Sequence, residues 1–158
     1  MIDPVEILLV EDNPADAELT VHALRETKLA NHIHVVQDGE EALDFVFCRG
    51  GYGQRKFDQP PKLVLLDLKL PKVDGLTVLR EMKRDPRTHA IPVTILTSSK
   101  EEQDMITGYA LGVNSYIQKP VDFAKFTQVA KQLGMYWLLV NQPPPTRSFE
   151  APRKSSAT

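Results

Sequence analysis

The chain has 158 residues, of which 42% are apolar, and a formal net charge of −2 at pH 7. This length suits one compact domain, and the charge gives no general attraction for nucleic acid. No apolar run approaches the roughly 20 residues that cross a bilayer, and the N-terminus lacks a signal-peptide pattern. We therefore expect a cytoplasmic protein that binds neither nucleic acid nor a membrane.

Short runs rich in leucine and β-branched residues alternate with longer amphipathic runs, which is the pattern of βα units. The predicted strands are residues 5–10, 32–36, 63–67, 92–96 and 113–118. The first and third are apolar without interruption until their ends, as in parallel strands that are buried on both faces. The sequence therefore predicts an α/β fold, a doubly wound domain around a five-stranded parallel sheet.

Helix-start signals follow each predicted strand. Asn13 and Pro14 provide a capping side chain and a proline at the first helical position of residues 14–28. Further helices are predicted at residues 39–47, 75–84 and 99–111, and a fifth begins at Asp122 and extends to about residue 140. These helices complete the βα alternation.

Two segments do not fit this alternation. Residues 48–61 are rich in glycine and proline and are long for a helix-to-strand connection, so a surface loop is predicted. Residues 141–158 have the proline and serine content of an extended tail. We therefore predict one domain over residues 1–140 and a tail over 141–158, with no output domain.

Polar residues gather at the predicted carboxyl ends of the strands, where parallel sheets place their functional sites. Glu11 and Asp12 follow the first strand, and Asp67 ends the third. Thr97 follows the fourth strand and Lys119 the fifth. Neighbouring carboxylates repel one another unless a cation joins them, which favours a hard divalent ion such as Mg²⁺ together with the lysine.

Such a pocket suits a tetrahedral, doubly negative group. A carboxylate beside a metal ion and an ammonium can attack phosphorus and become an acyl phosphate. In this interpretation Asp67 is the nucleophile, Lys119 neutralises a phosphoryl oxygen, and the hydroxyl of Thr97 donates a hydrogen bond to another. Taken alone, each of these residues is more often a cap, a turn residue or a surface charge.

In combination, these residues resemble those of the response-regulator receiver domains of two-component signalling. The resemblance covers residues 4–133 and is carried by four motifs in the right order and spacing. They are "LLVEDNPAD", "LVLLDLKLPKVDG", "PVTILTSS" and "YIQKPVD". Further stretches, "QKPVDF" and "GMYWLLVNQPPP", are similar to the single-domain regulators of bacterial and cyanobacterial phytochrome histidine kinases.

The resemblance implies further details of the site. Asp67 would be the phosphoacceptor and also a ligand of Mg²⁺. Glu11 and Asp12 would bind the ion directly or through water, and the backbone carbonyl of Lys69 would be a further ligand. Tyr116 would be the aromatic residue that turns inward with Thr97 on activation. The sheet would be flavodoxin-like with strand order 2-1-3-4-5, and the peptide bond from Lys119 to Pro120 would be cis.

The predicted function is that of a signalling switch rather than an enzyme with its own substrate. A sensor histidine kinase, phytochrome-like by resemblance, would donate a phosphoryl group to Asp67 in a reaction that the domain itself catalyses. It would likewise catalyse its own dephosphorylation. Output would pass to an unknown downstream protein.

The apolar run that contains Tyr136, Trp137 and Leu138 would form a homodimer interface, although it could instead pack on the domain's own core. Two other functions stay open. A Mg²⁺-dependent aspartyl-phosphate phosphatase would need a second acid two residues after Asp67, where this chain has Lys69. The other is an unphosphorylated pseudo-receiver that acts as a docking module.

Overall fold

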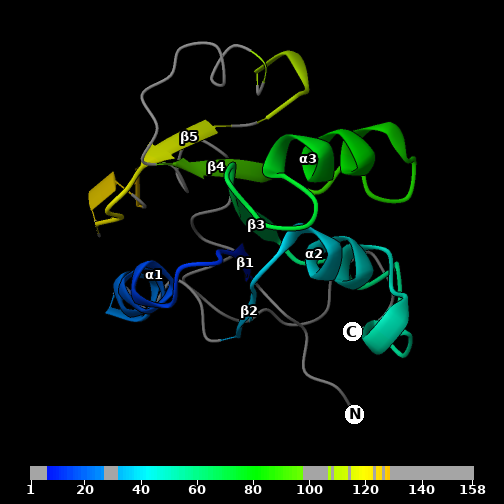
Figure 1. Ribbon diagram of the computed structural model, residues 1–158, viewed down its shortest axis with the longest axis horizontal. Coiled ribbons are helices and arrows are strands. Elements are labelled where there is room, and N and C mark those ends of the chain that lie inside the picture. The colour runs from blue at the N-terminus through cyan, green and yellow to red at the C-terminus, as the bar shows by residue number, and fades with distance from the viewer. Residues whose placement is uncertain are drawn as a thin grey trace, which may run out of the picture.

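The computed structural model describes residues 7–26, 32–97, 107, 109–113, 115–122, 124–125 and 127–128. The elements in chain order are β1 (Ile7–Val10), α1 (Pro14–Glu26), β2 (Ile33–Val36), α2 (Gly39–Val46), a short 3-10 helix η1 (Gly50–Tyr52), β3 (Leu63–Asp67), α3 (Gly75–Arg84), β4 (Val93–Thr97) and β5 (Ser115–Gln118). Figure 1 shows their arrangement.

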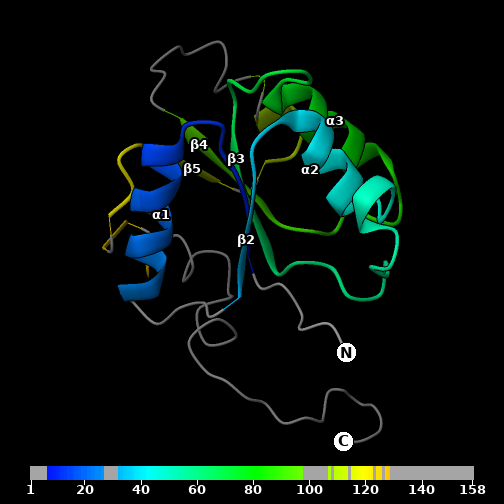
Figure 2. The same cartoon turned by 60° about the horizontal axis from the view of Figure 1, so that its bottom comes forward.

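The five strands form one sheet in the order β2-β1-β3-β4-β5, and every neighbouring pair is parallel. Helix α1 covers one face of this sheet, and α2 and α3 lie side by side on the other (Figure 2). The predicted flavodoxin-like fold and strand order are therefore confirmed.

The core has two parts because successive side chains of a strand point to opposite faces of the sheet. Leu8 and Val10 of β1 pack under α2 and α3, whereas Ile7 and Leu9 pack under α1. All four side chains are fully buried. This two-sided burial is the physical reason why β1 and β3 are continuously apolar.

Some strand limits differ from the prediction by one or two residues. The fourth strand was expected to begin at Pro92 but begins at Val93. Proline has no N–H for the sheet, although the carbonyl oxygen of Pro92 accepts a hydrogen bond from the backbone N–H of Val64 at 3.0 Å. The fifth strand was expected from Val113 and is described from Ser115.

Several predicted segments lie largely or wholly outside the described residues. They include most of the predicted helix 99–111, the helix after Asp122 beyond residue 128, and the tail 141–158. Asp122 does cap the chain that follows it, because its Oδ1 atom accepts a hydrogen bond from the backbone N–H of Lys125 at 2.8 Å. In the ranges that are described, no helix has the length and apolar character of a membrane span.

The predicted loop 48–61 is attached to α2 by polar and aromatic contacts. The guanidinium of Arg55 lies 3.7 Å from the ring centroid of Phe45 and donates a hydrogen bond to the carbonyl oxygen of that residue. The hydroxyl of Tyr52 donates to the carboxylate of Glu41 at 2.6 Å. These contacts hold the connection against the helix that precedes it.

A buried hydroxyl in β4 leads to a stability prediction. Thr94 is fully buried, and its Oγ1 atom has no hydrogen-bond partner among the residues that the structure describes. Thr94→Val replaces this hydroxyl with a methyl group of nearly the same size, so we expect the free energy of unfolding to rise by about 1 kcal/mol. Urea unfolding of both proteins measures the change, and a destabilised variant would indicate that the hydroxyl is hydrogen-bonded in solution.

Candidate functional site

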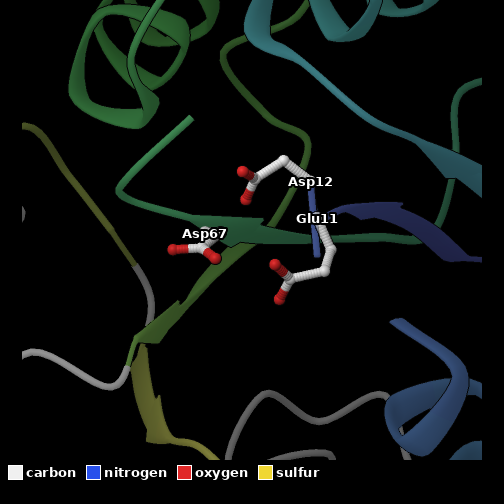
Figure 3. A group of neighbouring side chains, drawn as sticks. All are labelled: Glu11, Asp12 and Asp67. Atoms are coloured by element: carbon white, nitrogen blue, oxygen red, sulfur yellow. The ribbon is translucent and has the colours of Figure 1, made fainter. Parts of the chain in front are cut away.

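Three carboxylates meet at the carboxyl end of the sheet (Figure 3). Glu11 and Asp12 directly follow β1, and Asp67 is the last residue of β3. One oxygen atom from each of the three carboxylates lies within 4.8 Å of the others. Glu11 and Asp67 are buried and Asp12 is exposed, so the cluster opens to solvent on the Asp12 side.

The ammonium of Lys119 neutralises the inner part of this cluster. Its Nζ atom donates hydrogen bonds to Glu11 Oε1 at 2.6 Å and to Asp67 Oδ2 at 2.8 Å. The Lys119 side chain is only 10% exposed, so these ion pairs are largely shielded from water. The peptide bond that follows, to Pro120, is cis, as the resemblance implied.

Asp16 is a member of the site that the sequence analysis missed. Its Oδ2 atom accepts a third hydrogen bond from Lys119 Nζ, at 3.1 Å. The residue lies in the first turn of α1, where an acid is usually explained by the helix dipole. The one feature of the sequence that could have indicated its role is its position four residues after Asp12, about one helical turn.

Burial and charge act on the pKa values of this cluster in opposite directions. Burial is the largest effect on Glu11 and raises the pKa of its carboxyl from 4.5 to about 7, although the hydrogen bond from Lys119 opposes it. For Lys119, burial lowers the pKa, but the hydrogen bonds to Asp67, Glu11 and Asp16 outweigh burial and raise it overall. The ammonium therefore stays charged at all physiological pH values.

The backbone after β3 donates a hydrogen bond to the Asp67 side chain and brings the start of α3 close to it. The N–H of Lys69 donates to Asp67 Oδ1 at 3.1 Å, and the N–H of Gly75 donates to the carbonyl oxygen of Leu68 at 3.0 Å. Gly75 opens α3, and a Cβ atom built there would lie 2.2 Å from the carbonyl oxygen of Asp67. Only glycine permits this close approach of α3 to the site.

A cleft of about 510 Å³ lies beside the carboxylates. Its lining combines the polar residues Asp12, Lys69 and Asp74 with apolar residues from the loop after β3 and from the start of α3. Asp12 belongs both to this lining and to the carboxylate cluster, so the cleft adjoins the exposed edge of the cluster.

The remaining predicted site residues are placed to different degrees. Thr97 is the last residue of β4, in register with Gln118, and its side chain lies outside the described part. Tyr116 is half-buried in β5, with its ring 4.7 Å from that of the exposed Tyr109. The predicted interface residues Tyr136, Trp137 and Leu138 lie outside the described residues.

The donor set of this cluster fits a hard divalent cation. Three carboxylates offer oxygen atoms at one point, and Mg²⁺ prefers oxygen ligands together with retained waters. The exposed side of the cluster leaves room for those waters. Nitrogen and sulfur ligands, which softer metals prefer, are absent from this cluster.

The fold and the site together define the class of protein. Residues 7–131 match the model of the response regulator receiver domain, and the chain belongs to this family. It is a two-component response regulator related to phytochrome response regulators, and receiver domains act with histidine kinases. The resemblance inferred from the four motifs is thus confirmed.

Individual response regulators are similar to this chain over most of their length. Response regulator Rcp1 of Synechocystis sp. is 37% identical over 135 residues, which are 85% of this chain and 90% of Rcp1. The bacteriophytochrome response regulator AtBRR has a similar structure, with a TM-score of 0.78 and 50% identity over 89% of this chain and 100% of AtBRR. A probable methanogenesis regulatory protein of Methanothrix harundinacea, FilR2, is 42% identical over 90% of this chain and 89% of the length of FilR2.

One solved structure of Rcp1 bears directly on the metal. It is the Mn²⁺-bound form, with a TM-score of 0.70 and 36% identity over 90% of this chain and 100% of Rcp1. A relative of this fold thus binds a divalent cation.

Proposed function

We propose that this chain is a phosphoacceptor switch in which Asp67 receives a phosphoryl group from a sensor histidine kinase. The observation that carries the proposal is the position of Asp67, a buried carboxylate within hydrogen-bonding distance of Lys119 and beside two further acids. Membership of the receiver family supports the same chemistry.

In the proposed reaction, a carboxylate oxygen of Asp67 attacks phosphorus and the bond from phosphorus to the donor nitrogen breaks. Before the transfer, Lys119 donates a hydrogen bond to the carboxylate of Asp67, and after the transfer it neutralises a phosphoryl oxygen. The hydroxyl of Thr97 donates to a second oxygen. Glu11, Asp12, Asp67 and the backbone carbonyl of Lys69 would hold Mg²⁺, which when bound neutralises charge on the transferred group. The domain would catalyse both its own phosphorylation and the later hydrolysis.

The partners are proposed from the relatives and from the sequence. The similarity to AtBRR and Rcp1 favours a phytochrome-type kinase, whereas FilR2 is named a probable methanogenesis regulatory protein. Phosphorylation would shift Thr97 and Tyr116 and so change the surface that a downstream protein contacts. Tyr136, Trp137 and Leu138 would form the homodimer interface.

Intact-mass measurement after incubation with Mg²⁺ and acetyl phosphate tests the proposal. The wild type should gain one phosphoryl group, and Asp67→Ala or an excess of chelator should prevent the gain. If the wild type gains no mass from acetyl phosphate or from a phosphorylated histidine kinase, the chain is a docking module instead.

Asp12 provides a test of the metal site. Its side chain is exposed and belongs to the carboxylate cluster, so Asp12→Ala removes a proposed ligand and relieves repulsion without opening the core. Calorimetric titration should show Mg²⁺ binding at least tenfold weaker, a change of about 1.4 kcal/mol. The unfolding free energy without metal should be unchanged or higher.

Glu18→Ala, an exposed carboxylate change on α1, is the matched control and should leave Mg²⁺ affinity unchanged. Marked destabilisation of metal-free Asp12→Ala would mean that Asp12 has a structural role.

A further inference from the structure

Asp16 contacts the candidate site without belonging to its metal cluster. Its carboxylate accepts a hydrogen bond from Lys119 Nζ at 3.1 Å, whereas the cluster that could hold a metal consists of Glu11, Asp12 and Asp67. Metal binding therefore does not account for the contact between Asp16 and Lys119.

The start of α1 holds Asp16 in place. The backbone N–H of Asp16 donates to Asn13 Oδ1 at 3.0 Å, and the backbone N–H of Asn13 donates to Glu11 Oε2 at 3.2 Å. Because Lys119 bonds to both Glu11 and Asp16, these four residues form a closed ring of hydrogen bonds. The helix cap thus fixes Asp16 beside the ammonium.

Three carboxylates already use the three N–H groups of this ammonium. A phosphoryl oxygen can gain a hydrogen bond from Lys119 only by replacing one of them. Once Asp67 is an acyl phosphate it no longer carries a carboxylate charge, so its bond is the one that is released. Asp16 keeps its charge and its place beside Lys119.

We propose that Asp16 is a positioning residue that offsets part of the charge of Lys119 and so lowers the affinity of the site for the phosphoryl group. This inference rests on the proposed function of Asp67. The physical reason is that a carboxylate at 3.1 Å offsets part of the positive charge that the ammonium presents to a doubly negative group. The affinity is thereby set by a residue outside the metal cluster.

The test measures the dissociation constant of beryllium trifluoride, an anion whose beryllium becomes tetrahedral when it binds a carboxylate oxygen and so resembles a phosphoryl group. Calorimetry is done with Mg²⁺ on the full chain. Asp16→Asn should bind about two- to fivefold more tightly than the wild type, the range measured for partly exposed ion pairs. Asp16→Glu, which restores the charge, should return the affinity toward that of the wild type.

Two further variants separate this role from a structural one. Glu18→Gln removes an exposed charge from the same helix and should leave the affinity unchanged. In a Lys119→Met background, Asp16→Asn should no longer tighten binding, because the group through which it acts is gone. A purely structural effect on α1 would persist in that background and would overturn the inference.

Failure of the inference and failure of the proposed function give different results. A wild-type chain that takes no phosphoryl group from acetyl phosphate or a histidine kinase would overturn the proposed function. A wild-type chain that takes it, together with an Asp16→Asn affinity equal to or weaker than that of the wild type, would overturn only the role of Asp16.

Discussion

Replacement of Gly75 by alanine is expected to lower the free energy of unfolding by about 3 kcal/mol. A Cβ atom at this position would lie 2.2 Å from the carbonyl oxygen of Asp67 and 2.7 Å from the Cα atom of Leu68. Both are backbone atoms at the proposed phosphoacceptor, so α3 or the end of β3 would have to shift. Urea unfolding measures the loss, and phosphorylation by acetyl phosphate should also fall because Asp67 moves.

Gly51→Ala is the matched control for this prediction. A Cβ atom built at Gly51 meets nothing within 4 Å, and its φ is not in the left-handed region, so stability should change little. If Gly75→Ala were as stable as Gly51→Ala, the result would contradict the close packing of α3 against the backbone of Asp67 and Leu68.

Loss of the Lys119 ammonium is the second large effect. Lys119→Met leaves the buried carboxylates of Glu11 and Asp67 without their cation, and removal of one partner from a buried ion pair costs about 3–5 kcal/mol. We expect a loss near the lower end of this range in metal-free protein at pH 8, measured by urea unfolding. Lys125→Met, which changes an exposed lysine, should cost little.

The cost of Lys119→Met should depend on pH because of Glu11. The folded-state pKa of Glu11 is about 7, above its ordinary value of 4.5, so the folded protein binds this proton more tightly than the unfolded chain does. The resulting contribution to stability is complete below pH 4.5. That contribution is lost as the pH rises through 7. At pH 5 Glu11 is protonated and needs no cation, and the variant should then lose less stability than at pH 8.

A Glu11→Gln change tests the same idea at fixed pH. In the double variant with Lys119→Met, one unpaired charge is removed, so part of the lost stability should return at pH 8. An equal loss at pH 5 and pH 8, with no recovery in the double variant, would mean that the cost comes from lost packing of the lysine stem.

Local sequence patterns were sufficient for the strands and for the main acids. The continuous apolar runs of β1 and β3 reflect burial on two faces, and a parallel sheet brings all its strand ends to one edge. Glu11, Asp12 and Asp67 could therefore be predicted to meet without any knowledge of distances. Strand limits were less certain, since the start of β4 depends on a proline that lacks an N–H.

The tertiary structure decided the contacts that depend on how helices sit against the sheet. Asp16 is 103 residues from Lys119 in the chain, and only the packing of α1 on one face of the sheet brings the two side chains together. The close approach at Gly75 likewise depends on where α3 packs. The sequence by itself determined the fold class and the carboxylates at the sheet edge, because these follow from periodicity and strand direction. The family was inferred from the resemblance of the four motifs. The third partner of Lys119 and the raised pKa of Glu11 arise from burial and from distances between distant segments, which no local pattern encodes.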